Sequence, residues 1–205
     1  MGFEIGDLLH GDLRSVIEAI GLIGIFAIVF LESGMMVGFF FPGDSLLFTA
    51  GFLASQGFFN VWLLALGSFV FAVLGDSVGY TIGHKYGKRL FSKEDSLLFH
   101  KDHLKKAEAF YEKHGGKTII LARFIPVIRA FAPVVAGIGS MKYSTFIVYN
   151  LVGAFLWAIG MSFLGYFLGN IIPDVDKYLL PIIAFIILAS VAPAIYHIVK
   201  EKYAK

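Results

Sequence analysis

The stretch Glu32-Ser-Gly-Met-Met-Val-Gly-Phe-Phe-Phe-Pro-Gly-Asp44-Ser-Leu-Leu-Phe-Thr-Ala-Gly51 is apolar, carries two carboxylates and breaks in its middle. Pro42-Gly43 cannot continue a helix, and Asp44 then stands where an N-cap residue would start a new one. The arm from Ser45 to about Phe59 has roughly 15 residues, fewer than the roughly 20 that cross a bilayer. The stretch therefore predicts a re-entrant hairpin over residues 19–59, broken at Pro42 and Gly43.

The break in this stretch is also the first candidate for a working site. Irregular backbone at membrane depth is tolerated only where it is buried in protein or lines a wet cavity. Ionisable groups at that depth usually mark a transport path. Glu32 and Asp44, which flank the break, are therefore candidate functional acids.

Composition places the chain among integral membrane proteins. Of 205 residues, 58% are hydrophobic, and the mean hydropathy is +0.78. The polar sequence is too short for a separate soluble domain, so residues 1–205 are predicted to form a single membrane domain. The chain has no cysteine, which excludes disulfides and thiolate metal sites. His100 and His103 have the i,i+3 spacing of two zinc ligands without an evident third, and neither a metal nor a cofactor is predicted.

Outward from the hairpin, the sequence alternates spans with polar segments. Residues 1–18 carry four acids against one arginine, the reverse of a signal peptide, and are predicted to form an interfacial amphipathic helix. Residues 61–83 are long enough to cross a bilayer. Residues 84–117 hold nine of the seventeen Lys and Arg residues and are predicted to be a cytoplasmic loop. Residues 143–170 and 178–199 are predicted as two further spans, which return the C-terminus to the cytoplasm.

Residues 118–139 repeat the theme of the opening stretch, with bases in place of acids. Arg123 and Arg129 stand in an apolar segment that contains Pro126 and Pro133, so a second broken helix is predicted there.

A shift of 86 positions aligns several small and aromatic residues of the two halves. It superposes Gly51 on Gly137, Gly67 on Gly153, Phe69 on Phe155, Gly79-Tyr80 on Gly165-Tyr166, and Gly83 on Gly169. A re-entrant hairpin returns to its starting side and one span follows it, so the two copies would enter from opposite faces. This is the inverted repeat used by many secondary transporters, with broken helices near the midplane.

Three ordered motifs between about Ile20 and Asn170 carry a family resemblance. They are Glu32 with the block Phe-Phe-Pro-Gly-Asp-Ser-Leu-Leu ending at Leu47, Gly75-Asp76-Ser77-Val78-Gly79-Tyr80, and Arg123-Phe-Ile-Pro-Val-Ile-Arg129 followed by Ala136-Gly137. With these motifs the chain resembles the DedA family, whose domain is also called SNARE-associated or VTT.

The resemblance implies a membrane transport protein with two facing re-entrant hairpins. Bacterial members of the family are associated with recycling undecaprenyl phosphate, the lipid carrier of cell-wall synthesis, and with the proton-motive force. Eukaryotic relatives are linked to phospholipid scrambling. The functional acids of the family fall on Glu32 and Asp44, and its functional bases fall on Arg123 and Arg129. Family membership alone does not fix the substrate.

Each of these side chains has a functional and a structural interpretation. Glu32 and Asp44 would exchange protons, because burial disfavours a charged carboxylate and a nearby arginine favours it. Arg123 and Arg129 would hold a phosphate through their planar forks, helped by free N–H groups where a helix restarts near Pro133. The alternative is that acids and bases only balance one another in salt bridges.

Asp76 has two interpretations of its own. It either belongs to the same cavity as the other charges or only caps local packing against Ser77 or Tyr80.

The sequence thus predicts an all-α polytopic membrane protein with two broken re-entrant hairpins in an inverted repeat plus about three transmembrane helices. Its predicted function is to move a phosphate-bearing lipid, undecaprenyl phosphate or a glycerophospholipid, between leaflets of a bacterial-type inner membrane with proton coupling. A proton-coupled carrier of ions or small solutes is the alternative. No enzyme arrangement of Ser, His and Asp is evident, and a purely structural factor would leave the buried charges unexplained. Membrane lipids and protons are the expected partners, nucleic acid is not, and the sequence leaves a homo-oligomer open.

Overall fold

A computed structural model of the chain describes residues 13–35, 43–90 and 115–171. Residues 1–12 of the predicted amphipathic segment 1–18, the break residue Pro42 and the third predicted span at 178–199 lie outside the described residues. So does most of the predicted basic loop.

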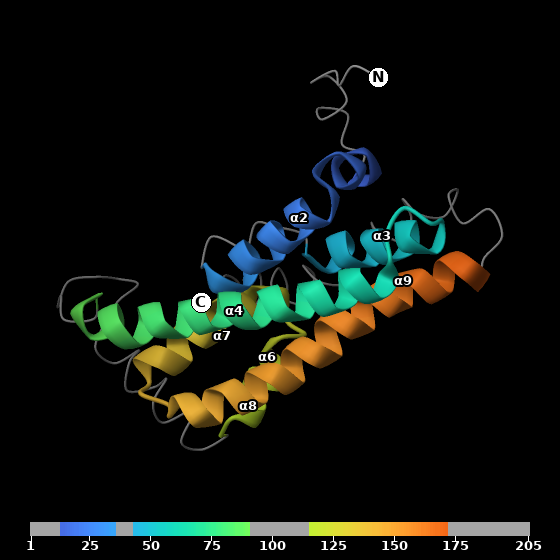
Figure 1. The fold of residues 1–205 in the computed structure, drawn as a ribbon. Coiled ribbons are helices and arrows are strands. Elements are labelled where there is room, and N and C mark those ends of the chain that lie inside the picture. The colour runs from blue at the N-terminus through green and yellow to red at the C-terminus, as the bar shows by residue number, and fades with distance from the viewer. Residues whose placement is uncertain (1–12, 36–42, 91–114, 172–205) are drawn as a thin grey trace, which may run out of the picture. The chain divides into compact units, whose positions relative to one another are not determined.

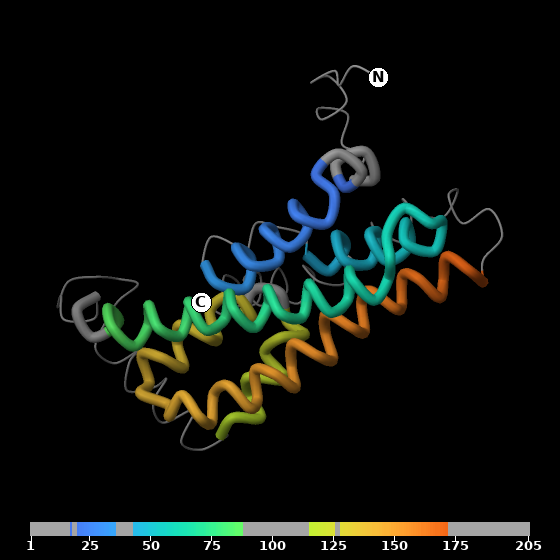
Figure 2. The backbone as a smooth tube through the Cα atoms, viewed as in Figure 1, coloured from blue at the N-terminus to red at the C-terminus, as the bar shows by residue number. Residues whose placement is uncertain are grey.

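The described residues are helical and contain no strand (Figure 1). The elements are α2 (Leu13–Gly34), α3 (Gly43–Ser55), α4 (Val61–Leu90), α6 (Lys117–Ala122), α7 (Pro126–Ile138), α8 (Tyr143–Ala154), the π-helical turn η2 (Phe155–Ile159) and α9 (Gly160–Ile171). The predicted all-α class is therefore confirmed over these residues. Figure 2 traces α8, η2 and α9 as one continuous tube.

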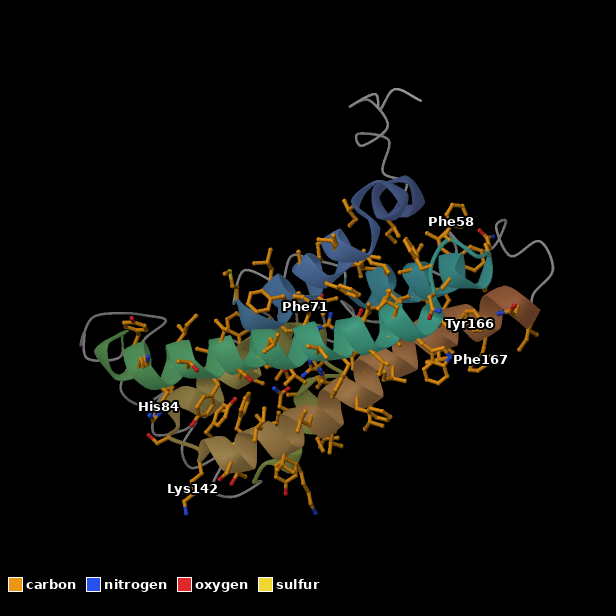
Figure 3. All side chains as sticks on the ribbon, in the orientation of Figure 1. Phe58, Phe71, His84, Lys142, Tyr166 and Phe167 are labelled. Atoms are coloured by element: carbon orange, nitrogen blue, oxygen red, sulfur yellow. The ribbon has the colours of Figure 1, made fainter. Side chains whose placement is uncertain are left out.

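Among residues 13–35, 43–90 and 115–171, two helical stretches are long and apolar enough to cross a membrane. They are Val61–Gly87, with 27 residues, and Tyr143–Ile171, with 29. At 1.5 Å per residue each is roughly 40 Å long, more than the roughly 30 Å hydrocarbon core. Aromatic side chains such as Phe71 and Phe167 project from these stretches in Figure 3, as expected of lipid contacts. Helix α4, which contains the first of these stretches, continues to Leu90, so the start of the predicted basic loop is helical. No proline interrupts this extension, and the span continues past its predicted end.

The helices on either side of the first predicted break are short. The backbone of α2 is non-helical at Gly21, where φ is 58°, so two helical segments meet there. α3 has 13 residues and begins at Gly43, which places Asp44 inside its first turn rather than at the N-cap. A carboxylate in the first turn still faces the positive end of the helix dipole. The chain then turns at Gly57, whose φ is 86°.

The second broken segment has its break before Pro126. α6 ends at Ala122, Ile125 is extended with φ −115°, and Pro126 opens α7, where its missing N–H removes no helical bond. The predicted break at Pro133 is wrong, because this proline lies inside α7 and the helix continues to Ile138. Its ring packs next to Gly79 of α4, so tertiary contact offsets the lost backbone bond.

The chain forms two compact units. The first comprises residues 1–28, 42–68 and 158–205, and the second comprises residues 29–41 and 69–157. We call them unit 1 and unit 2.

In unit 1, α3 packs along α9 through glycines. A Cβ atom at Gly51 would collide with the carbonyl oxygen of Ser162, and one at Gly165 with that of Phe48. Two helical backbones can approach so closely only where a side chain is absent.

Unit 2 repeats this contact between α7 and α4. A Cβ atom at Gly83 would collide with the carbonyl oxygen of Val134, and one at Gly137 with that of Tyr80. The 86-residue shift carries Phe48 and Gly51 of α3 onto Val134 and Gly137 of α7. The same shift relates the partner helices with a slip of one helical turn, since Gly165 corresponds to Gly79. Each unit thus contains a close helix contact through glycines, and the inverted repeat itself stays a prediction.

Candidate functional site

The candidate site lies in unit 2, where glycines bring α2 and α4 together. A Cβ atom at Gly34 would collide with the backbone of Gly75, and one at Gly75 with the carbonyl oxygen of Phe30. This approach sets Glu32 of α2 and Asp76 of α4 beside the interface of the two helices. Both carboxylates are buried, with 2% and 3% of their surface exposed.

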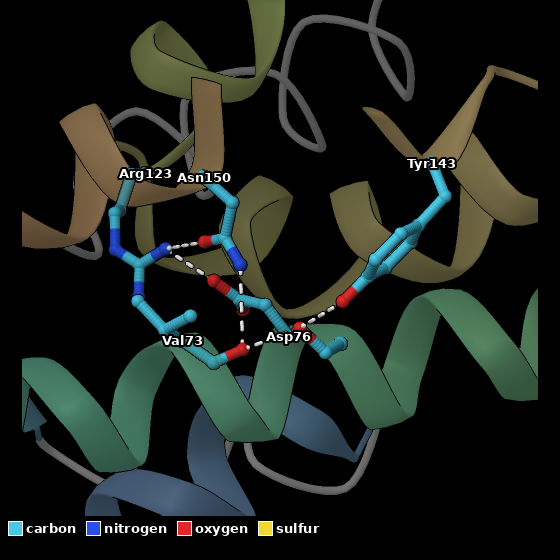
Figure 4. Close-up of polar contacts among 6 residues, drawn as sticks. Val73, Asp76, Arg123, Tyr143 and Asn150 are labelled. Atoms are coloured by element: carbon cyan, nitrogen blue, oxygen red, sulfur yellow. Dashed lines mark hydrogen bonds and ion pairs between the residues drawn. The ribbon is translucent and has the colours of Figure 1, made fainter. Parts of the chain in front are cut away.

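Arg123 follows α6, which packs on α8, and its side chain is buried in unit 2. Its Nη1 donates to the carboxylate of Asp76 and, at 3.0 Å, to the amide oxygen of Asn150 (Figure 4). Arg123 therefore links the end of α6 to both α4 and α8. Its Nε is buried and has no hydrogen-bond partner among the described residues.

Asn150 joins α8 to α4 from the other side of the same group. Its Nδ2 donates to the carbonyl oxygen of Val73 at 3.4 Å, and this oxygen also accepts from the Ser77 hydroxyl at 2.8 Å. The Tyr143 hydroxyl in turn lies 3.3 Å from Ser77 Oγ, and Figure 4 shows the whole chain of contacts. Asn150 is thereby held in an orientation that presents its oxygen to Arg123.

Arg129 forms the second ion pair. It lies in α7, and its backbone N–H bonds to the carbonyl oxygen of Ile125 at the helix start. Its Nη2 donates to the carboxylate of Glu32, and only 10% of the arginine side chain is exposed. Two arginines and two carboxylates are thus paired within one unit, and their formal charges cancel.

Trp157 lies against both guanidinium groups. The ring centroid is 4.8 Å from Cζ of Arg129 and 5.5 Å from Cζ of Arg123. Trp157 is buried and is carried by the π-helical turn η2, a feature that often occurs at functional sites. Gly153, one turn earlier, lies next to Arg123, because a Cβ atom there would be 3.4 Å from Cδ of the arginine, an ordinary van der Waals contact.

The arrangement is expensive as a purely structural device. Removing two charged groups from water costs several kcal/mol per ion, and buried pairs are often no more stable than apolar packing of equal volume. Two such pairs next to one aromatic ring are therefore better explained by chemistry that uses the charges. Planar guanidinium groups match the oxygens of a carboxylate or a phosphate.

The structure brings together four of the five charged residues that the sequence singled out. Glu32, Asp76, Arg123 and Arg129 lie in unit 2, whereas Asp44 lies in unit 1 and is half-buried. The approach of Asp44 to the arginines stays a prediction. Asp76 pairs with Arg123, and its place in a transport cavity stays a prediction. We call Glu32, Asp76, Arg123 and Arg129 the charged group.

The helix N-terminus predicted to help bind an anion near Pro133 is not there. The expected N–H groups near Pro133 do not start a helix, because α7 begins at Pro126. Any contribution of helix N–H groups would come from the first turn of α7, which also carries Arg129.

Sequence reasoning missed Asn150 and Trp157. Asn150 is the one amide in the apolar stretch 146–161, which was a usable signal. It shares a helix face with Gly153 and Trp157, at spacings i+3 and i+7. The signal for Trp157 was weaker, because a buried tryptophan in a span reads as ordinary packing.

Comparison with known proteins gives a consistent family assignment. The VTT domain matches residues 41–167. Protein DedA of Escherichia coli K12 is 44% identical over 210 residues, which cover 98% of this chain and 95% of that protein. An uncharacterized membrane protein of Mycobacterium leprae is 45% identical over 82% of this chain and 75% of its own length. The inner membrane protein YqjA of Escherichia coli K12 is 29% identical over 87% and 84%. No solved structure matches the chain significantly.

Proposed function

Because this chain belongs to the VTT-domain family of DedA membrane proteins, we propose that it transports a phosphate-bearing lipid between membrane leaflets, with undecaprenyl phosphate as the first candidate. Transport is coupled to protons in this proposal. The family resemblance supplies the substrate class, and the charged group of unit 2 supplies a means of binding it.

The observation that carries the proposal is the pair of buried ion pairs, Arg123 with Asp76 and Arg129 with Glu32. A lipid phosphate cannot cross hydrocarbon unaided, because its charge would lose its hydration. Two arginines would replace that hydration with charge-assisted hydrogen bonds. The buried Nε of Arg123 offers a donor that no described residue uses.

Short helices support the re-entrant arrangement that such a site needs. α3 and α7 each have 13 residues, which corresponds to roughly 20 Å of helix. Neither is long enough for a hydrocarbon core of roughly 30 Å. In the proposed topology both belong to re-entrant hairpins, and the inverted repeat presents them from opposite faces.

Proton coupling follows from competition for the arginines. An arriving phosphate displaces a carboxylate from its arginine, and a buried carboxylate without a cationic partner favours its protonated form. Phosphate binding and proton uptake then assist each other, since coupling between two ligands is reciprocal. Glu32 faces Arg129 and Asp76 faces Arg123, so both carboxylates qualify, and Asp44 remains a third candidate.

The proposed setting is the cell membrane, crossed several times, with the basic loop at residues 84–117 and the C-terminus in the cytoplasm. The basis for this topology is the concentration of Lys and Arg residues in the loop at residues 84–117. Membrane lipids and protons are the proposed partners.

The test is reconstitution of the purified protein into liposomes with a leaflet-selective probe, comparing undecaprenyl phosphate with phosphatidylethanolamine. We expect movement of undecaprenyl phosphate that accelerates with a proton gradient and stops in Arg129→Gln. Lys142→Gln is the matched control, because Lys142 is exposed at the start of α8 (Figure 3).

Three outcomes would count against the proposal. Equal movement of both lipids without a gradient would identify a passive scramblase. Movement of ions or small solutes with both lipids static would favour the rival carrier. Equal activity of Arg129→Gln and wild type would leave the ion pairs with a structural role only.

A further inference from the structure

Trp157 is an uncharged side chain that lies against both arginines of the charged group, at 4.8 Å from Cζ of Arg129 and 5.5 Å from Cζ of Arg123. Both distances are within the roughly 6 Å over which an aromatic face attracts a cation. The attraction also strengthens where water is absent, and Trp157 is only 3% exposed. The ring therefore supplies both guanidinium groups with a partner that does not gain or lose a proton as the pH changes.

The other partners of the arginines differ in this respect. Glu32 of α2 and Asp76 of α4 are titratable and face Arg129 and Arg123, while α8 contributes the neutral Asn150. When the carboxylates take up protons, their hold on the arginines weakens. The attraction of the indole ring is unchanged by that event.

We infer that Trp157 is a positioning residue that keeps Arg123 and Arg129 in place for an incoming phosphate while their carboxylates are protonated. This inference rests on the proposed function. It goes beyond the four charged residues that the family resemblance singles out, because it assigns a role to an aromatic side chain on η2.

If the inference is right, the effect of weakening the Trp157 ring on phosphate affinity depends on pH. At high pH the carboxylates fix the two arginines, so weakening the ring should hardly alter phosphate binding. At low pH the ring carries more of this task, so weakening it should reduce phosphate affinity. A ring that served only to fill space would show no such difference between the two pH values.

The chain suits a direct test, because it contains only two tryptophans. Trp62 is 62% exposed and contacts the ring of Phe163, and both residues belong to unit 1. Trp62→Phe therefore leaves Trp157 as a single fluorophore and a single site for fluorinated tryptophan. Fluorine withdraws electron density from the ring face and weakens cation binding with little change in shape.

The experiment titrates the Trp62→Phe protein in detergent with a short-chain prenyl phosphate at pH 5.5 and pH 8.5, following Trp157 emission. The measurement is repeated with mono-, di- and trifluorinated tryptophan. We expect affinity at pH 5.5 to fall about three- to thirtyfold across the series, and to change less than twofold at pH 8.5. Trp157→Phe should behave as a weak ring, and Trp157→Leu, read by calorimetry, should lose the most affinity at low pH.

Two results would overturn the inference. Equal affinities across the fluorinated series at both pH values would remove the role of Trp157 and leave the proposed function intact. Absence of any response to the prenyl phosphate in the Trp62→Phe protein, confirmed by calorimetry on the wild type, would overturn both.

Discussion

Arg129 in the first turns of α7 pairs with Glu32 near the end of α2, and 97 positions of sequence separate the two residues. The pair joins the two sequence segments of unit 2, because Glu32 lies in residues 29–41 and Arg129 in residues 69–157. A neighbouring pair, Asp76 with Arg123, spans 47 positions in the same unit. The two pairs define what the following variants should change.

Replacing either arginine with lysine tests the planar fork. Arg123→Lys and Arg129→Lys keep the charge, but an ammonium cannot reproduce the two parallel hydrogen bonds that a phosphate accepts. We expect each variant to lose about tenfold or more in lipid transport, equivalent to about 1.4 kcal/mol, at normal expression. Lys142→Arg is the matched control on an exposed site. Full activity of both variants would favour plain charge balance.

Removing one member of the Asp76 pair should destabilise the protein more than removing both. Asp76→Asn leaves Arg123 buried without its counter-charge, which costs about 3 to 5 kcal/mol in comparable cases. The double variant Asp76→Asn with Arg123→Gln should recover much of this stability and still lack transport. Thermal unfolding in detergent measures the first effect, and the liposome assay measures the second. Additive losses in the double variant would show that the pair is not coupled.

Neutral replacements of the acids should abolish the response to pH. Glu32→Gln mimics the protonated carboxylate, so phosphate binding should persist while the steep rise in transport toward low pH disappears. Asp44→Asn, in unit 1, is expected to do the same if Asp44 serves as a coupling group. Headgroup affinity and transport rate across a pH series check both variants. A wild-type profile that is flat with pH would show that these carboxylates are not coupling groups.

Two glycines on α9 offer a matched test of close helix packing. A Cβ atom at Gly165 would strike the backbone of Phe48, whereas nothing lies within 4 Å of a Cβ atom at Gly160. Gly165→Ala should therefore lower stability by about 1 to 3 kcal/mol. Gly160→Ala should leave stability unchanged or raise it slightly, since alanine favours a helix. Unfolding of both proteins in the same detergent gives the comparison, and equal midpoints would argue against the α3–α9 contact.

The proposed topology can be tested on a natural cysteine-free background. Single cysteines at the exposed positions Lys85 and Lys142 should react only from the cytoplasmic side, and those at Asn60 and Asn170 only from outside. Membrane-impermeant thiol reagents applied to cells and to inverted vesicles distinguish the faces. Lys85 and Asn60 labelled from one side would refute the crossing of α4.

The sequence by itself determined the features that depend on neighbouring residues along the chain. Apolar length identified the two spans that the structure describes, and Pro126 marked the second break, whereas the predicted helix restart near Pro133 was wrong. The acidic residues of the first broken segment and the basic residues of the second could also be recognised, because a charged residue in an apolar run stands out in the sequence alone. All four of the residues now paired, Glu32, Asp76, Arg123 and Arg129, were singled out in this way.

Only the tertiary structure decided which acid meets which arginine. Asp76 on α4 pairs with Arg123 after α6, and Glu32 on α2 pairs with Arg129 on α7, because the helices of unit 2 pack together in this way. The same packing permits Pro133 within α7 and places Trp157 against both guanidinium groups. These contacts join residues far apart in sequence, and their geometry is set by how closely helices pack, which local sequence rules do not encode.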